Sequence, residues 1–407
     1  MPETIIKINL DKYCLDGEAI LVIDTVEKTA PAKGGIRVHQ RVSEEEITSL
    51  AGEMTQKCIL AGLPFGGAKG GIRLSDLEQV ERAMYAFGRE LSKLDFLPYK
   101  WCAAPDVNTN CKAVDAFIAG CASVKGWRKS RIAATGKSSG IPHELGSTAY
   151  GIVLSTELLI KNLGLPLAID GAGVIIEGMG EVGGNAAKIL LEKGARILGV
   201  SDITGAVYNP AGLAGDTLTE VIDKKIPLSE AAELFPGAAY DLSSPSLLQK
   251  KADILVLAGP GRSITADNVN KLQVKVITEG ANIAYADRAL RKIVQDKGIY
   301  SIPGIIANSG GVISSHEEWL LENEDLMALP MEEKWERVKN SIEQRITRNM
   351  TELCHKIKAN LDKTTHENAL EMAAERQLIM RNANRGLREQ TKQINDELEK
   401  RFSVYTR

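Results

Sequence analysis

The sequence predicts an α/β protein with two domains and a C-terminal helical segment. Its 407 residues are too many for one small core, so two or three domains are expected. Strands and helices alternate in the middle of the chain, which is typical of a parallel sheet covered by helices on both faces. The charged last part contains few glycines or prolines. We therefore predict one α/β domain at residues 1–150, a second at 151–330, and helices that pack back on them at 331–407.

Composition and charge argue against several function classes. Hydrophobic residues make up 44% of the chain and charged residues 25%, as in ordinary globular proteins. A net charge of -3, from 50 basic and 53 acidic residues, does not favour a nucleic-acid partner. The chain has no apolar run long enough for a membrane span and no apolar signal region, so a cytoplasmic location is expected. The six cysteines are scattered without a C-x-x-C pair, so neither a disulfide scaffold nor a metal site is expected.

The first domain is expected to mix strands and helices. Residues 19–26 have strand composition, and residues 34–40 predict a second strand. Residues 43–60 predict a helix, because three glutamates occupy its first turn, where the helix dipole favours negative charge. Residues 77–94 predict another helix from apolar residues at helical spacing. The paired glycines at 66–71 are expected to form a loop.

The second domain alternates strands and helices. Five short apolar runs predict its strands: 172–178, 195–202, 252–259, 275–282 and 299–306. A helix is expected at 185–193, ended by Gly194. The charged C-terminal part predicts two more helices, at 332–357 and 367–399. Such alternation predicts a parallel sheet with helices on both faces.

A glycine pattern follows the first strand of this domain. Gly178, Gly180 and Gly183 spell G-x-G-x-x-G between a strand and a helix, and the next strand ends in Asp202. Gly178 would permit a tight turn, Gly180 would let N–H groups approach a pyrophosphate, and Gly183 would let the helix pack closely. Asp202 would accept hydrogen bonds from ribose hydroxyls. This context favours a Rossmann-like NAD(P)-binding domain. The alternative is a glycine-rich turn that binds no ligand. Because no Lys or Arg lies between Asp202 and Pro210, NAD is favoured, although a basic residue from elsewhere could still hold NADP.

Three lysines and one aspartate are candidate catalytic residues. Lys33 and Lys69 lie among paired glycines, and Lys57 lies in an apolar helical stretch. Burial and neighbouring positive charge lower the pKa of a lysine and can make it a base near neutral pH. Asp106 follows small and apolar residues and could exchange protons with a substrate. Three surface lysines and a turn-capping aspartate are the simpler alternative.

Polar residues also follow the last predicted strand of the second domain. Asn308 and Ser315 flank a glycine turn there. Ligands of parallel sheets bind beyond the carboxyl ends of the strands, so these residues are candidate substrate contacts. For Ser314 or Ser315, a role as helix N-cap is an equally strong interpretation.

Five motifs occur in order along the chain: PAKGGIR, LPFGGAKGG, PDVNTN, GMGEVG and ANSGGV. Together they resemble the glutamate/leucine/phenylalanine/valine dehydrogenases, and most closely the glutamate dehydrogenases, over about residues 20–380. The resemblance implies reversible oxidative deamination of L-glutamate to 2-oxoglutarate and ammonium, with NAD or NADP. It also implies that residues 1–150 bind substrate and mediate oligomerisation, in a homo-oligomer for which a hexamer is favoured.

The resemblance also implies a role for each candidate residue. Lys69 would polarise the substrate carbonyl and activate water, and Asp106 would shuttle protons. Lys57 would hold the α-carboxylate, while Lys33 and Ser315 would hold the side-chain carboxylate. The remaining substrate contacts implied are Ala104, Asn308 and Val312. The implied cofactor contacts are Thr148, Glu181, Val182 and Asn282, beside the three glycines and Asp202.

Lys33 favours glutamate as the substrate. Relatives that act on branched-chain or aromatic amino acids carry an apolar residue at this position, and a buried lysine facing an apolar side chain would be an unpaired charge. Two departures from the family pattern lie near the cofactor: Glu144 replaces an arginine, and residues 282–285 replace Asn-Gly-Pro-Thr-Thr. Two alternatives therefore stay open, a dehydrogenase of another L-amino acid and a non-catalytic, nucleotide-binding regulatory paralogue.

Overall fold

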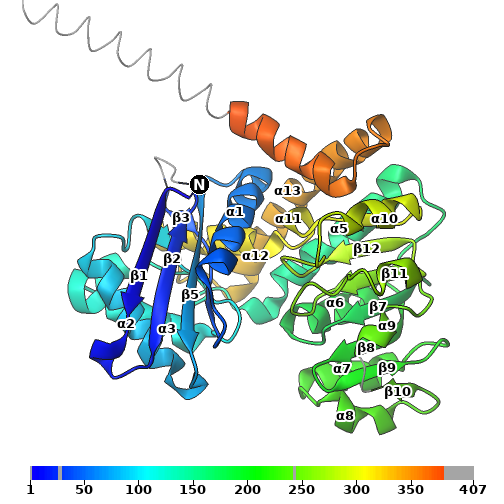
Figure 1. The fold of residues 1–407 in the computed structure, drawn as a ribbon, viewed down its shortest axis with the longest axis horizontal. Helices are drawn as coiled ribbons and strands as arrows, with labels where there is room; N and C mark the ends of the chain where they lie inside the picture. The colour runs from blue at the N-terminus through cyan, green and yellow to red at the C-terminus, as the bar shows by residue number, and fades with distance from the viewer. Residues whose placement is uncertain (1, 26–29, 242–243, 380–407) are drawn as a thin grey trace, which may run out of the picture.

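The chain forms two α/β lobes that lie side by side, with helices between them (Figure 1). The computed structural model describes residues 2–25, 30–241 and 244–379. Each lobe contains one sheet, and the two sheets share no strand. The predicted fold class is confirmed.

The sheet of the first lobe mixes parallel and antiparallel strands. Its strands are β1 (Thr4–Asn9), β2 (Gly17–Ile23), β3 (Ala32–Lys33), β4 (Ile36–Val38), β5 (Gly66–Leu74) and β6 (Trp101–Cys102). They follow the order β1-β2-β5-β3-β6, and β4 also pairs with β5. Ile20 and Val22 of β2 pack against helix α1 (Glu44–Ala61), while alternate residues of the same strand share a core with α2 (Val80–Lys93) and α3 (Cys111–Lys125). The sheet is therefore covered on both faces.

The glycine-rich segment expected to be a loop is the central strand β5. A Cβ on Gly67 would lie 2.2 Å from Thr55 Oγ1, and one on Gly71 would lie 2.5 Å from Ile47 Cδ1. Thr55 and Ile47 both belong to α1, so the glycines let this helix lie directly on the strand. Because alternate residues of a strand face the same side, Lys69 also faces α1.

The sheet of the second lobe has seven strands in the order β10-β9-β8-β7-β11-β12-β13. They are β7 (Gly173–Glu177), β8 (Arg196–Asp202), β9 (Gly205–Tyr208), β10 (Ala239–Asp241), β11 (Ile254–Leu257), β12 (Val276–Glu279) and β13 (Tyr300–Ile302). The five strands predicted from the sequence are all present and parallel. The antiparallel strands β9 and β10 at one edge were not predicted. β8 and β11 flank β7 on opposite sides, so the order in which strands are added to the sheet reverses at β7. Open parallel sheets bind ligands at such a point.

Helices complete the lobes and join them. The remaining α-helices are α4 (Trp127–Ser130), α5 (Ser147–Leu163), α6 (Glu181–Glu192), α7 (Gly215–Asp223), α8 (Leu228–Ala231), α9 (Ser244–Leu247), α10 (Leu290–Asp296), α11 (Gly304–Ala307), α12 (Gly310–Asn323) and α13 (Met331–Ala359), and residues 365–379 are also helical. Single 3-10 turns lie at Asp11–Tyr13, Leu77–Gln79, His143–Leu145, Ala232–Leu234 and Val269–Lys271. Within the described parts of the chain, no helix combines the length and apolar character needed to cross a bilayer.

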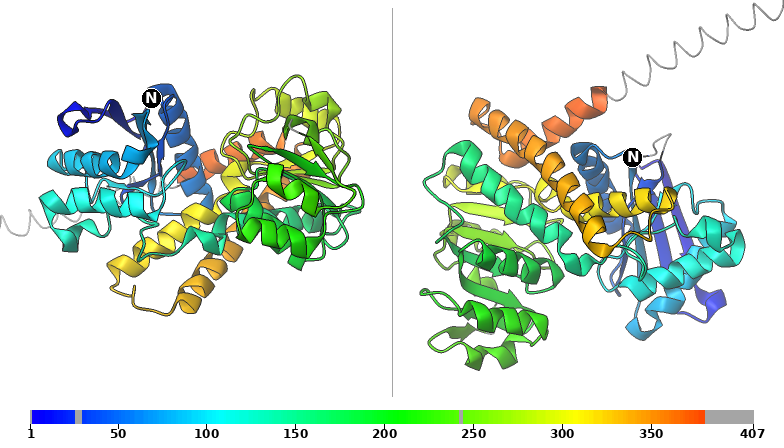
Figure 2. Two further views of the ribbon diagram at one scale, coloured as in Figure 1. Left: turned by 90° about the horizontal axis from the view of Figure 1, so that it is seen from below. Right: turned by 180° about the vertical axis from the view of Figure 1, so that it is seen from behind.

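Helices α12 and α13 lie between the two lobes (Figure 2), whereas α5 packs on the second lobe against α6 and β12. Arg345 of α13 donates to the carbonyl of Ala61 at 2.6 Å, and Arg376 donates to that of Leu60 at 2.6 Å. Both carbonyls belong to the C-terminal end of α1, where a helix dipole favours cations. The C-terminal helices therefore attach to the first lobe at α1.

Two predictions from the sequence differ from the helices found. The predicted glycine turn at Gly310–Gly311 is the first turn of α12, and a Cβ on Gly310 would lie 2.0 Å from the carbonyl oxygen of Ser147. Helix α6 begins at Glu181, four residues earlier than expected. The predicted helix at 367–399 is helical as far as residue 379, and its remainder lies outside the described residues. The predicted domain boundary at residue 150 falls inside α5, and the domain bounds stay a prediction.

Candidate functional site

A cavity of about 260 Å³, the interlobe cavity, lies between residues of the first lobe and residues of the second lobe and α12. It is lined by most of the residues singled out from the sequence: Lys33, Lys57, Lys69, Ala104, Asp106, Thr148, Val182, Asn282, Asn308, Val312 and Ser315. All the expected catalytic and substrate residues therefore meet in one place. Three of the expected cofactor residues join them there.

The three lysines of this cavity are buried. Lys33, Lys57 and Lys69 are only 1%, 6% and 4% exposed, so the alternative of three surface lysines is wrong. Each comes from a regular element, Lys33 from β3, Lys57 from α1 and Lys69 from β5. Three buried cations in one cavity favour an anionic ligand, because an uncompensated buried charge is costly.

Among the residues that the structure describes, no carboxylate lies within ion-pair distance of Lys33. Its Nζ donates to the carbonyl of Ala103 at 2.7 Å, to Thr135 Oγ1 at 2.7 Å and to the carbonyl of Cys102 at 3.4 Å. Burial lowers the pKa of Lys33, because neutral acceptors compensate the charge less than water does. A carboxylate that entered beside Lys33 would supply the missing negative charge.

Lys57 connects the two lobes. Its Nζ donates to Asn282 Oδ1 at 3.0 Å, and Asn308 Nδ2 donates to the same oxygen at 3.3 Å. Burial lowers the pKa of Lys57 to about 8, with a further contribution from the positive charge of Lys69 and an opposing one from Glu53. The ammonium is therefore the main form at pH 7 and is lost as the pH rises through about 8, and an anionic ligand would stabilise it.

Lys69 and Asp106 form an ion pair at 2.7 Å between Nζ and Oδ2. Arg37 donates from Nε to the same oxygen at 2.9 Å. Burial alone would raise the pKa of Asp106, but Lys69 and Arg37 outweigh it and hold that pKa well below its usual range. Thr109 Oγ1 accepts the backbone N–H of Asp106 at 2.6 Å. Asp106 is thus an ionised carboxylate in a fixed position rather than only a turn cap.

Helices α11 and α12 supply the opposite wall. Asn308 ends α11, and its Oδ1 is buried without a hydrogen-bond partner among the described residues. Ser315 lies inside α12, whose first residue is Gly310, so neither Ser314 nor Ser315 is an N-cap. Val312, one turn before Ser315, lines the same wall. This wall therefore offers an unused amide oxygen, a hydroxyl and an apolar contact.

The glycine pattern has the geometry that a dinucleotide requires. Gly178 has a φ of +90°, and a Cβ on it would lie 2.6 Å from the backbone of Ala258. A Cβ on Gly183 would lie 1.8 Å from the carbonyl oxygen of Gly178. In contrast, a Cβ on Gly180 would meet no atom within 4 Å. Two glycines therefore allow close packing, and the third leaves open space at the start of α6, where backbone N–H groups bind phosphates.

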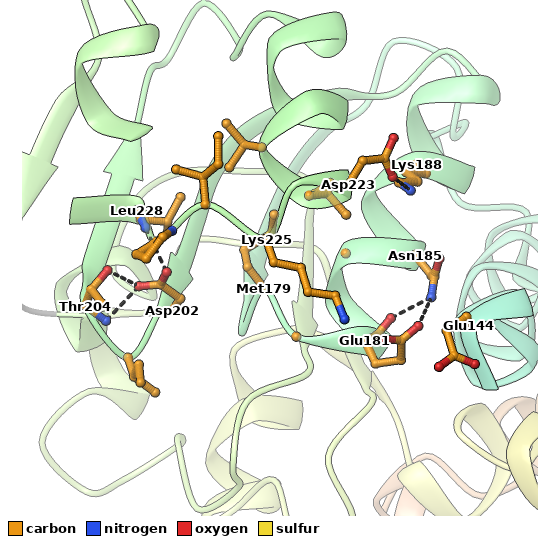
Figure 3. A pocket seen from close by; sticks show the side chains of 17 residues that line it. Glu144, Met179, Glu181, Asn185, Lys188, Asp202, Thr204, Asp223, Lys225 and Leu228 are labelled. Atoms are coloured by element: carbon orange, nitrogen blue, oxygen red, sulfur yellow. Dashed lines mark hydrogen bonds and ion pairs between the residues drawn. The ribbon is translucent and has the colours of Figure 1, made fainter. Parts of the chain in front are cut away.

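A second cavity of about 520 Å³, the α6 cavity, lies beside this turn (Figure 3). Of the expected cofactor residues, Gly180, Glu181 and Asp202 line it, whereas Gly178 and Gly183 lie in neither cavity. The two cavities meet at the first turn of α6, because Glu181 lines one and Val182 the other. A ligand as long as a dinucleotide could therefore extend from one to the other.

Asp202 is partly engaged by the protein. Its Oδ1 accepts the N–H and the hydroxyl of Thr204 at 2.7 and 2.6 Å, and its Oδ2 accepts the N–H of Leu228 at 2.9 Å (Figure 3). These bonds hold the carboxylate at the end of β8. Oδ1 also accepts the N–H of Gly205 at 3.2 Å, so its lone pairs are occupied, whereas Oδ2 accepts one bond and can accept another from a ribose hydroxyl.

Several lining residues were missed by the sequence analysis. Lys188 pairs with Asp223 in the α6 cavity (Figure 3). Lys225, two residues after the end of α7, extends into the same cavity. They lie far from Asp202 in the sequence, and only the fold brings them together. Met54, which lines the interlobe cavity, could have been found, because it precedes Lys57 by one helical turn.

Comparison with known proteins agrees with this site. The family model described as Glutamate/Leucine/Phenylalanine/Valine dehydrogenase matches residues 139–386. The model described as the Glu/Leu/Phe/Val dehydrogenase dimerisation domain matches residues 19–122. The chain belongs to this dehydrogenase family. The resemblance predicted from the five motifs is thereby confirmed, and the chain is a member of an oxidoreductase family.

Individual relatives of this dehydrogenase share about a third of its sequence. It is 33% identical over 309 residues to the catabolic NAD-specific glutamate dehydrogenase of Bacillus subtilis, with 73% of this chain and 69% of the relative covered. It is 36% identical over 305 residues to a glutamate dehydrogenase of Aeropyrum pernix, with 71% and 69% covered. A crystal structure of the hetero-hexameric glutamate dehydrogenase from Thermus thermophilus superimposes with a TM-score of 0.77, at 26% identity, over 92% of this chain and 88% of that chain.

Proposed function

We propose that this dehydrogenase catalyses the reversible, NAD-dependent oxidative deamination of L-glutamate. The reaction converts glutamate, NAD⁺ and water into 2-oxoglutarate, ammonium, NADH and a proton. The observation that carries the proposal is the meeting of three buried lysines and Asp106 in one cavity beside a dinucleotide-binding turn. The relatives named as glutamate dehydrogenases support glutamate over another amino acid.

The substrate would lie with one carboxylate at each end of the interlobe cavity. Lys33 and Ser315 hold the side-chain carboxylate, and Lys57 holds the α-carboxylate. A charge-assisted hydrogen bond to each lysine replaces a neutral contact, and such bonds are roughly twice as strong as neutral ones. Ala104 and Val312 contact the carbon chain between them.

The chemistry takes place beside Lys69 and Asp106. Bound NAD⁺ would supply the hydride acceptor for the α-carbon of glutamate, leaving an iminium. Lys69 then polarises the water that adds to this carbon, and Asp106 carries the protons that leave the water and reach the departing ammonia. Asn308 orients the reacting amine through its unused Oδ1. The lobes exclude bulk water around these steps.

The cofactor would extend from the α6 cavity to the interlobe cavity. The turn at Gly178, Gly180 and Gly183 would hold its pyrophosphate, while Glu181 and Asp202 lie near the adenosine part. Thr148, Val182 and Asn282 would contact its nicotinamide part. The α6 cavity is lined by four carboxylates and two lysines, and one of these lysines is paired with Asp223. Because negative charge disfavours a ribose 2′-phosphate, we favour NAD over NADP.

We further propose that the protein works as a homo-oligomer in the cytoplasm, with a hexamer favoured. The match to a dimerisation-domain model and the hetero-hexameric relative support an assembly. Light scattering after size-exclusion chromatography would give its mass, and a monomer at micromolar concentration would contradict the proposal.

The proposed function is tested by one assay with the purified chain. Formation of NADH or NADPH is followed at 340 nm with glutamate, leucine, valine or phenylalanine as substrate. We expect oxidation of glutamate with NAD and much slower oxidation of the apolar amino acids. A preference for an apolar amino acid would favour a dehydrogenase of another L-amino acid. Inactivity with every pair, together with NAD binding measured by calorimetry, would favour a regulatory paralogue.

A further inference from the structure

Arg37 lies behind the proposed proton carrier Asp106 without lining the interlobe cavity. It belongs to β4, and its side chain is 13% exposed. Its Nε lies 2.9 Å from Asp106 Oδ2, the oxygen that also receives Lys69 Nζ at 2.7 Å. Two cations therefore share one oxygen of the carboxylate.

The other carboxylate oxygen of Asp106, Oδ1, is free to accept a proton. In the described part of the chain, Oδ1 accepts no hydrogen bond, whereas Oδ2 accepts two charged ones. An oxygen with two cationic donors has a low affinity for a proton, so a proton that reaches this carboxylate binds Oδ1. The bond from the Asp106 N–H to Thr109 Oγ1 fixes the backbone of this residue, and the two donors on Oδ2 oppose the rotation about Cβ–Cγ that would exchange the two oxygens.

Arg37 is itself held from the opposite side. Its Nη1 donates to Glu46 Oε1 at 2.6 Å, in the first turn of α1. Glu46 Oε2 lies 3.2 Å from His39 Nε2. The guanidinium is thus held by Glu46 of α1 as well as by Asp106.

We propose that Arg37 is a positioning residue, which fixes Oδ2 of Asp106 and thereby reserves Oδ1 as the proton carrier of the reaction. The inference rests on the proposed function, because it concerns the proton transfer of that reaction. Asp106 is faced by Lys69 from β5 and by Arg37 from β4, with Lys57 of α1 as the next cation. Arg37 is faced by Asp106 and Glu46, and Glu46 also by His39.

The test compares kcat and the KM values for glutamate and NAD in Arg37→Gln, Arg37→Lys and the wild type. Without the guanidinium, Lys69 alone holds Oδ2 of Asp106, so the proton is no longer directed to Oδ1. We expect kcat of Arg37→Gln to fall about 10–100-fold with both KM values unchanged, because no group that lines the interlobe cavity is lost. Arg37→Lys keeps a charge beside Oδ2, so we expect it to restore part of kcat.

Two further variants separate positioning from folding. Arg73→Gln is the matched control, because Arg73 lies on β5 and pairs with Glu18 at the surface, and we expect its kcat to equal that of the wild type. Glu46→Gln removes one anchor of Arg37 but keeps the guanidinium, so we expect a smaller loss of kcat than with Arg37→Gln. Thermal unfolding of each variant shows whether it folds. If Arg37→Gln does not fold, the kcat values of Arg37→Lys and Glu46→Gln decide between the outcomes.

The outcomes distinguish this inference from the proposed function. A folded Arg37→Gln variant with the kcat of the wild type overturns the inference alone. Equal losses of kcat in Arg37→Gln and Arg37→Lys, or a KM that rises as much as kcat falls, also overturn it, because a merely structural arginine would behave in this way. A wild-type chain that oxidises no amino acid overturns the proposed function and the inference together.

Discussion

The two cavities that meet at the first turn of α6 have opposite charge and different burial. The interlobe cavity is lined by three lysines, all less than 7% exposed, and one carboxylate. The α6 cavity is lined by Glu144, Glu181, Asp202 and Asp223, with Lys188 and Lys225. The first suits a ligand with two carboxylates, and the second suits a ligand rich in hydroxyls.

The difference also shows how each cavity is stabilised. Buried lysines need negative charge or strong acceptors. Of the three lysines in the interlobe cavity, only Lys69 has a carboxylate within ion-pair distance in the described parts of the chain. Lys33 and Lys57 rely on neutral oxygens. In the α6 cavity, exposed charges are screened by water and cost little. A ligand therefore contributes most where charge is least compensated, which is the interlobe cavity.

The largest expected effect tests the chemical role of the interlobe cavity. Lys69→Ala should lower kcat by about 10²–10⁴-fold, because the general acid–base partner of Asp106 is lost. Binding of NAD, measured by calorimetry, should change little, because Lys69 does not line the α6 cavity. Lys112→Ala on the exposed side of α3 is the control. Turnover near that of the wild type would remove Lys69 from the mechanism.

Lys33→Leu tests whether charge in this cavity selects the substrate. The variant loses a charge-assisted hydrogen bond, so kcat/KM for glutamate should fall about 10–100-fold. Oxidation of leucine relative to glutamate should rise, because the buried charge no longer opposes an apolar side chain. The measurement is the ratio of kcat/KM for the two amino acids. An unchanged ratio would assign substrate selection to other residues.

Two alanine substitutions separate binding from packing at the turn where the cavities meet. Gly183→Ala should lower the free energy of unfolding by about 1–3 kcal/mol, because its Cβ would lie 1.8 Å from the carbonyl oxygen of Gly178. Gly180→Ala should keep wild-type stability, because its Cβ meets open space, and should weaken NAD binding about tenfold. Thermal unfolding and calorimetry measure the two effects. Wild-type NAD affinity in Gly180→Ala would place the pyrophosphate elsewhere.

The smallest expected effect is a pH dependence of dicarboxylate binding, which the interlobe cavity should show. Because the pKa of Lys57 is lowered to about 8, its ammonium is lost as the pH rises through that value. Inhibition by glutarate, a dicarboxylate without an amine, should therefore weaken about fourfold by pH 8.5. Lys57→Arg keeps its charge and should bind glutarate equally at pH 7 and 8.5. A pH-independent inhibition constant in the wild type would exclude Lys57 as a carboxylate ligand.

The chain order of the elements and the residue types of the site could be predicted from the sequence. Short apolar runs separated by helices predict a parallel sheet wherever they occur, and the five predicted strands of the second lobe are present. The glycine pattern before α6 was recognisable because its function depends on backbone geometry that only glycine permits. The motifs predict the candidate lysines and Asp106, but the burial of these residues is not visible in the sequence.

Other features depend on contacts between distant segments. The segment around Lys69 contains four glycines and was expected to be a loop, but it is a strand because α1 and β2 pack on it. Its strand conformation is stabilised by pairing and packing, which composition does not reveal. The charge of the α6 cavity was likewise hidden, because Lys188, Asp223 and Lys225 reach it only through the fold.

The sequence by itself determined the alternation of strands and helices, the dinucleotide turn and the set of ionisable residues available for chemistry. These depend on local periodicity, on backbone freedom and on side-chain type. Only the tertiary structure decided that three lysines from β3, α1 and β5 share one buried cavity, and that Arg37 and Lys69 meet on one oxygen of Asp106. Burial and distance set pKa values and ion-pair energies, and both arise only when segments far apart in the chain come together.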